Sequence, residues 1–99
     1  MRMISYTTKS ERAAENRTLI EGVFEALHDS ALAGISYTVL ESGDGHFMHV
    51  VESTDGASQA LQNLPAFKAF LAGLNNRQSV PNVTTQLRLV GSYGQPIGQ

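Results

Sequence analysis

The order of the apolar patterns is the feature of this 99-residue chain that most constrains its fold. Four runs are rich in the β-branched and aromatic residues of strands, and two longer stretches repeat apolar residues with helical spacing. Their order is strand, helix, strand, strand, helix, strand, which predicts a ferredoxin-like βαββαβ sandwich of class α+β with a four-stranded antiparallel sheet. The expected strands cover 2–8, 35–41, 46–52 and 83–93; the expected helices run from Ser10 to near Gly34 and from Pro65 to Asn76, with a short helical piece over 57–61.

A glycine-rich turn joins the second and third expected strands. The segment 42–45 (Ser-Gly-Asp-Gly) is typical of a hairpin loop rather than of a phosphate-binding loop. If the hairpin pairs Ser42 with Gly45, Tyr37 and His49 lie on opposite faces of the sheet and share no pocket. A three-residue loop would reverse this arrangement.

The composition indicates one small globular domain. The chain is 41% hydrophobic and 16% charged, which suits neither a disordered chain nor a membrane protein. We expect a single α+β-barrel domain over 1–94 and a flexible C-terminal tail, rich in Gly, Pro and Gln, over 95–99.

Charge and cysteine content limit the partners and the compartment. Seven Lys and Arg residues are scattered over a chain of net charge −2, so we expect no nucleic-acid partner. The absence of cysteine excludes disulfides, thiolate metal sites and a Cys nucleophile. Residues 1–9 turn polar before any long apolar stretch can form, so we expect no signal peptide and no membrane partner. These features predict a cytoplasmic protein.

The third expected strand has apolar residues on both faces. Phe47, His49 and Val51 occupy one face, and Met48 and Val50 occupy the other. The helices of one chain cover only one face of such a sheet, so a second subunit is the natural cover for the other. We therefore expect a homodimer through the sheet face, in the form of a closed dimeric α+β barrel. The alternative is that Met48 and Val50 are tolerated surface residues.

His49 is the leading candidate for chemistry, because an imidazole in a mostly apolar strand titrates near the range needed for proton transfer. The alternative is a core histidine bonded to a backbone carbonyl or a neighbouring hydroxyl. Arg77 follows the second long helix, where it either clamps an anionic ligand or caps helix carbonyls. Tyr6 and Tyr93 offer hydroxyls to a pocket or lie half-buried at a sheet edge. The predicted ligand-binding residues are Phe24, Phe47, Phe67, Phe70 and Arg77.

No metal and no cofactor are expected. His46 and His49 are three residues apart on a strand and therefore point to opposite faces. The His, Asp and Glu residues show no spacing typical of metal ligands.

Several short segments carry a resemblance to a known superfamily. They include Gly-His-Phe-Met-His-Val at 45–50, Leu-Pro-Ala-Phe-Lys-Ala-Phe at 64–70, and the segments 15–27, 34–37 and 90–93. In these segments the chain resembles small proteins of the dimeric α+β-barrel superfamily, which includes the antibiotic-biosynthesis monooxygenases. The resemblance covers Ile4 to Tyr93 and implies the fold more than a particular chemistry.

Two branches of that superfamily carry recognisable features. The haem-degrading members use an Asn on the first strand and a His on the second long helix. Here 5–7 reads Ser-Tyr-Thr and 65–77 contains no His or Trp, which disfavours haem degradation. The quinone-forming members oxidise aromatic polyketides without a cofactor, and the protein mainly binds and deprotonates an electron-rich phenol or anthrone.

Together these observations predict a cytoplasmic homodimer with a small, mainly apolar cavity beneath the helices. By resemblance, it would bind a small aromatic or otherwise hydrophobic metabolite and act as a cofactor-independent monooxygenase with His49 as the base. The alternative is a non-catalytic binding or structural dimer in which the same phenylalanines fill the core. A cavity of at least roughly 300 Å³ would favour the first interpretation, and solid packing the second.

Overall fold

The computed structural model describes residues 1–94. The predicted tail over 95–99 lies outside these residues. The elements are β1 (Arg2–Thr8), the short 3-10 helix η1 (Ser10–Arg12), α1 (Ala13–Ser30), β2 (Ile35–Ser42), β3 (His46–Ser53), α2 (Asp55–Asn63), α3 (Pro65–Ala72), α4 (Leu74–Arg77) and β4 (Gln78–Gln86).

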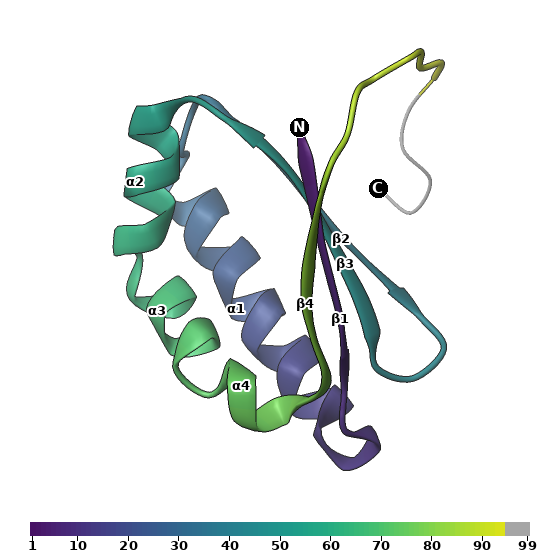
Figure 1. The fold of residues 1–99 in the computed structure, drawn as a ribbon. Coiled ribbons are helices and arrows are strands. Elements are labelled where there is room, and N and C mark those ends of the chain that lie inside the picture. The colour runs from purple at the N-terminus through teal and green to yellow at the C-terminus, as the bar shows by residue number, and fades with distance from the viewer. Residues whose placement is uncertain (95–99) are drawn as a thin grey trace.

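The four strands form one antiparallel sheet in the order β2-β3-β1-β4. The helices all lie on one side of this sheet (Figure 1), where α1 packs against α3 and α2 to α4 form the second helical segment. The predicted α+β, ferredoxin-like βαββαβ sandwich with a four-stranded antiparallel sheet is confirmed.

The core lies between the helices and one face of the sheet. Alternate residues of β1 and β3 point into it, since Tyr6, Phe47 and Val51 are each at most 5% exposed. On the helices, the apolar stripe of α1 and single residues of α2 to α4 complete it. The buried apolar cluster consists of Tyr6, Ile20, Val23, Phe47, Leu61, Phe70 and Leu74.

The boundaries of the first helix differ from the prediction. Residues 10–12 form a separate 3-10 helix, and no side-chain hydrogen bond caps the start of α1. The helix ends at Ser30 rather than near Gly34, because Ala31 adopts the left-handed conformation (φ 50°) in which its N–H reaches the carbonyls of the last turn.

The last strand also differs from the prediction. It begins at Gln78 and ends at Gln86, whereas the apolar alternation predicted a strand over 83–93. Pro81 fits inside it because it lies in the irregularity between Val80 and Val83 of an edge strand, where it pairs with no residue of β1. Leu87 donates its N–H to the carbonyl of Met1, and the paired register of β4 with β1 ends at Gln86 opposite Arg2. Residues 87–94 run past the end of the sheet (Figure 1).

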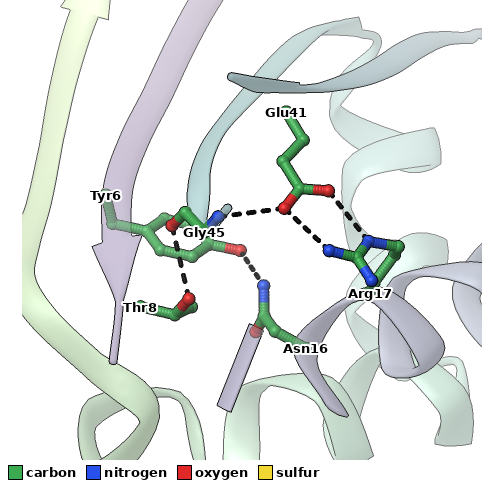
Figure 2. Close-up of polar contacts among 6 residues, drawn as sticks. All are labelled: Tyr6, Thr8, Asn16, Arg17, Glu41 and Gly45. Atoms are coloured by element: carbon green, nitrogen blue, oxygen red, sulfur yellow. Dashed lines mark hydrogen bonds and ion pairs between the residues drawn. The ribbon is translucent and has the colours of Figure 1, made fainter. Parts of the chain in front are cut away.

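The loop between β2 and β3 contains three residues, 43–45, and pairs Ser42 with His46. Gly45 has φ of +107°, and a Cβ at this position would lie 2.6 Å from the hydroxyl of Thr8. Its N–H donates to the Glu41 carboxylate at 2.9 Å, and its carbonyl accepts from the N–H of Thr8 at 2.8 Å. Figure 2 shows Glu41 between Gly45 and the guanidinium of Arg17, which it contacts at 2.8 Å. This loop therefore has a fixed length and fixed contacts.

The face of the sheet turned away from the helices is partly apolar. Met48 and Val50 of β3 lie on this face and are half-buried, whereas Phe47, His49 and Val51 are buried beneath the helices. The predicted division of β3 between two faces is confirmed. The row of paired residues across the outer face reads Leu40, Met48, Ser5 and Val83, of which Leu40 and Val83 are 53% and 56% exposed.

Candidate functional site

The centre of the candidate site is a buried histidine held between two tyrosines. Nε2 of His49 lies 2.8 Å from the hydroxyl oxygen of Tyr6, and its Nδ1 lies 2.7 Å from the hydroxyl oxygen of Tyr37. The three rings come from β3, β1 and β2 and share the core face of the sheet, with ring centroids 5.3 and 5.9 Å from that of His49. Both nitrogens of His49 are thus occupied by phenol groups.

This arrangement corrects the register that would separate the two residues. A pairing of Ser42 with Gly45 would put Tyr37 and His49 on opposite faces. The structure has the three-residue loop instead, so Tyr37 pairs with Val51, Val39 pairs with His49, and the side chains of Tyr37 and His49 meet.

A second set of buried polar groups continues from Tyr6 into the helices. The side-chain amide of Asn16 on α1 donates to the Tyr6 hydroxyl at 3.0 Å (Figure 2). Its carbonyl oxygen accepts from Nε of Arg77 at 2.9 Å. Asn16 and Arg77 are 0% and 2% exposed. Five side chains, Arg77, Asn16, Tyr6, His49 and Tyr37, therefore form one continuous hydrogen-bonded chain.

Arg77 has a structural position. Its guanidinium donates to the carbonyl of Phe70 at 2.5 Å and lies over the Phe70 ring, with Cζ 5.4 Å from the centroid. It thus caps a carbonyl of α3, which is one of the two roles that the sequence left open. Arg77 does not line the cavity beside His49.

Burial sets the protonation states of the histidine and the two tyrosines in this hydrogen-bonded series. It lowers the pKa of His49 to about 4, so the imidazole is neutral at pH 7. Burial raises the pKa of Tyr6 to about 12, although the hydrogen bond from Asn16 and the charge of Arg77 oppose this effect. Burial, and then the proximity of Tyr6, raise the pKa of Tyr37. At neutral pH both tyrosines therefore keep their protons.

A cavity of about 160 Å³ opens beside these rings. It falls below the roughly 300 Å³ that would by itself favour the ligand-binding interpretation, but it is comparable to an engineered apolar cavity of about 150 Å³ that binds benzene. Its walls are mainly apolar and come from β1, β2, β3, β4, α2, α3 and α4. The lining residues are Arg2, Ile4, Tyr6, Tyr37, His49, Val51, Leu61, Phe67, Phe70, Leu71, Leu74, Asn82 and Thr84.

The predicted ligand-binding phenylalanines occupy two different places. Phe67 and Phe70 line the cavity, with their ring centroids 6.1 Å apart. Phe24 and Phe47 do not line it. They lie behind the tyrosines, where Phe47 stacks on Tyr6 with centroids 5.7 Å apart and Phe24 contacts Tyr37 at 5.2 Å. Phe24 and Phe47 thus support the site, whereas Phe67 and Phe70 form its wall.

Asn16 and Tyr37 belong to the site although they were not among the predicted site residues. Asn16 occupies the apolar stripe of α1, and a lone polar residue in a buried stripe is a signal that could have indicated a buried hydrogen-bond partner. For Tyr37, the missing information was the loop length, which the Gly-Asp-Gly sequence does not determine. Tyr93 lies on the segment beyond the sheet and is fully exposed.

Within residues 1–94 no three or more His, Cys, Asp or Glu side chains are grouped so as to hold a metal ion. His46 points away from His49, and its Nδ1 lies 2.9 Å from the hydroxyl of Thr7. In the same part of the chain, no helix combines the length and apolar character needed to cross a membrane.

Similarity to other proteins is found at the level of structure. No protein-family model matches the sequence, and no curated protein matches it significantly. An antibiotic biosynthesis monooxygenase of known structure superposes with a TM-score of 0.70 and 15% identity, over 91% of this chain and 97% of that one. Rv0793 of Mycobacterium tuberculosis gives 0.70 and 16% over 94% and 96%, and a protein of unknown function from Nitrosomonas europaea gives 0.68 and 15% over 96% and 92%. The chain therefore has the fold of the antibiotic-biosynthesis-monooxygenase-like proteins, as the resemblance in sequence implied.

Proposed function

We propose that the protein binds a small aromatic or otherwise hydrophobic metabolite in the cavity beside His49. The observation that carries this proposal is an apolar cavity with a buried, fully hydrogen-bonded polar group at one wall. Apolar walls with a few fixed polar groups are characteristic of small-molecule sites. The volume of about 160 Å³ favours a ligand of one or two rings.

The proposed activity is a cofactor-independent oxidation of such a ligand by dioxygen. For 1-naphthol the balanced reaction gives 1,4-naphthoquinone and water: one oxygen atom enters the ring and the other leaves as water. The role proposed for His49 is that of base. Because both ring nitrogens contact tyrosines, a ligand proton would reach His49 only through a tyrosine hydroxyl.

The competing function is a non-catalytic binding or structural dimer of the same fold. It is favoured by the pKa of about 4 for His49, because an imidazole of this pKa is a weak base towards a phenol at neutral pH. Oxygen uptake separates the two. With 1-naphthol, the monooxygenase function requires dioxygen consumption and quinone absorbance that are lost in His49→Ala. Binding of 1-naphthol without oxygen uptake would leave the non-catalytic function.

The homodimer through the outer face of the sheet is part of the same proposal. It is supported by the half-exposed Leu40 and Val83 at the ends of the largely apolar row Leu40, Met48, Ser5 and Val83, and by the residues that follow β4. Leu89, Val90 and Tyr93 are at least 64% exposed, and within residues 1–94 they pair with no strand. A second copy would cover the row and offer a surface to these residues. The expected cytoplasmic location also remains a proposal.

Binding is tested with indane, a two-ring hydrocarbon, by titration while the NMR signals of the protein are followed. The signals of Phe67, Phe70 and Leu71 should shift with saturation. Thr84→Trp should abolish this effect, because Thr84 lines the cavity from the edge strand and a large side chain there would fill the cavity. Gln59→Trp on the exposed surface of α2 is the matched control. Unchanged cavity signals in the native protein would contradict the proposal.

A further inference from the structure

The geometry points to a direction in the buried hydrogen-bonded chain. We propose that Arg77, Asn16, Tyr6, His49 and Tyr37 donate hydrogen bonds in that order, so that the last O–H, that of Tyr37, is presented to the cavity and selects ligands with an oxygen acceptor, such as an aromatic ketone. This inference rests on the proposed ligand-binding function and adds the chemical class of the ligand.

The first two links have only one direction. A guanidinium carries only donors, so Arg77 must donate to the side-chain carbonyl oxygen of Asn16. With that oxygen occupied, the amide nitrogen of Asn16 faces Tyr6 and donates to its hydroxyl oxygen. The orientation of the amide is therefore fixed by the charged group behind it.

The third link follows from the burial of Tyr6. Its oxygen accepts from Asn16, and its own proton needs an acceptor because the side chain is only 2% exposed. The acceptor within reach is Nε2 of His49 at 2.8 Å. In this arrangement Nε2 carries no proton, and the single proton of the neutral imidazole resides on Nδ1.

The last link leaves one proton without an acceptor in the chain. Two phenol O–H groups and the one N–H of a neutral imidazole supply three donor protons, but only two hydrogen bonds join the three side chains. Nδ1–H of His49 donates to the oxygen of Tyr37 at 2.7 Å, so the phenol proton of Tyr37 is the one that remains. Tyr37 lines the cavity and is less buried than Tyr6, so this proton can reach a ligand oxygen.

The charge at the other end of the chain strengthens this donor. Arg77 is buried, and in residues 1–94 it forms no ion pair with a carboxylate. Hydrogen bonds in series polarise one another, and the effect is larger away from water. The resulting donor favours an oxygen that carries or develops negative charge, such as that of a ketone or a phenolate.

The tautomer of His49 tests the direction without any ligand or mutation. In ¹⁵N-labelled protein, two-bond correlations between the ring protons and nitrogens assign the proton to one nitrogen. The proposal requires the proton on Nδ1 at pH 7. A proton on Nε2, or on both nitrogens, would overturn it.

Selectivity is tested with two probes of one shape, 1-indanone and indane. The ketone should bind the native protein about fivefold more tightly than the hydrocarbon, which corresponds to one net hydrogen bond of about 1 kcal/mol. Tyr37→Phe should bring this ratio close to one while indane still binds. Arg77→Met, which removes the charge without touching the ligand, should reduce the ratio, whereas a merely structural role would affect both probes equally.

The outcomes separate the inference from the function on which it rests. If indane binds and the ketone has no advantage in the native protein, the ligand-binding function stands and the inference is wrong. If neither probe binds, the ligand-binding function is contradicted and the proposed selectivity falls with it. The tautomer still decides the direction of the chain in both cases.

Discussion

The hydroxyl oxygen of Tyr37 lies 2.7 Å from Nδ1 of His49, on the core face of two adjacent antiparallel strands. This contact depends on the three-residue loop between β2 and β3, because a change of one residue in register would turn one of the two side chains to the other face. The site is therefore positioned by a turn that contributes no side chain to it.

Gly45→Ala should destabilise the protein by about 3 kcal/mol. The substitution forces a residue with a Cβ to adopt φ of +107° and brings that Cβ within 2.6 Å of the Thr8 hydroxyl. Chemical denaturation measures the loss. Gly56→Ala is the control, because its position in the first turn of α2 leaves space for a methyl group and it should be neutral or slightly stabilising. Equal stabilities of the two variants would contradict the strained geometry of the loop.

Stability should fall by about 3 kcal/mol as the pH decreases from 6.5 to 4, through His49 alone. Its pKa is 6.5 in the unfolded chain and about 4 when folded, so the unfolded state binds more protons in this interval. The contribution is complete above pH 6.5 and is lost as the pH falls through 4. Denaturation at several pH values should show this slope, and His49→Gln should lack it.

The subtraction of the His49→Gln curve is needed because Glu15 and Glu41 also have lowered pKa values, through their hydrogen bonds to Arg12 and Arg17. Both carboxylates are present in the two proteins, so their contributions to the pH dependence of stability cancel in the difference. If the stabilities of the native protein and of His49→Gln ran parallel between pH 6.5 and 4, the pKa of His49 would not be lowered by folding.

Asn16→Leu should cost at least about 2 kcal/mol, because it leaves both the Arg77 guanidinium and the Tyr6 hydroxyl without a buried partner. The double variant that combines Asn16→Leu with Arg77→Met should recover part of this loss, because the buried charge without a partner is then removed. A double-mutant cycle by urea denaturation measures the coupling. Additive losses would show that the two side chains do not share one interaction.

Met48→Glu should dissociate the proposed dimer. Met48 lies in the middle of the outer apolar row, between Leu40 and Ser5, and a carboxylate buried there against a second copy would have no partner. Analytical ultracentrifugation should give a dimer for the native protein and a monomer for the variant. Gln59→Glu on α2 adds the same charge on an exposed helix surface and should remain dimeric. A native monomer at micromolar concentration would contradict the proposal directly.

The fold was predictable because its signals are local. Period-two and helical patterns are written in neighbouring residues, so the order of the elements, the hairpin and the two-sided β3 followed from the sequence. The end of β4 did not, because the alternation of residues 87–93 is strand-like but the pairing of β4 with β1 ends at Gln86 opposite Arg2. A strand needs a neighbour, and that information lies elsewhere in the chain.

The site was only partly predictable for a related reason. His49 was recognised as an imidazole in an apolar strand, but its partners come from β1 and β2, and Asn16 is linked to Arg77 across 61 positions of sequence. Which of these groups meet depends on strand register and helix packing rather than on residue type. The same is true of Phe24 and Phe47. As aromatic residues they were predicted to line the cavity, but their rings pack against Tyr37 and Tyr6 instead.

The short loop at 43–45 also has an evolutionary consequence. A descendant that gained or lost a single residue there would shift β2 by one residue against β3, which would place Ser36 or Thr38 beside the imidazole in place of Tyr37 and turn Ile35 and Val39 away from the core. Such a change would convert a phenol donor into a small side chain in one step, without a substitution at any position of the cavity wall. In a chain of this fold, the length of this hairpin would then decide which side chain of the second strand lies beside the position of the imidazole.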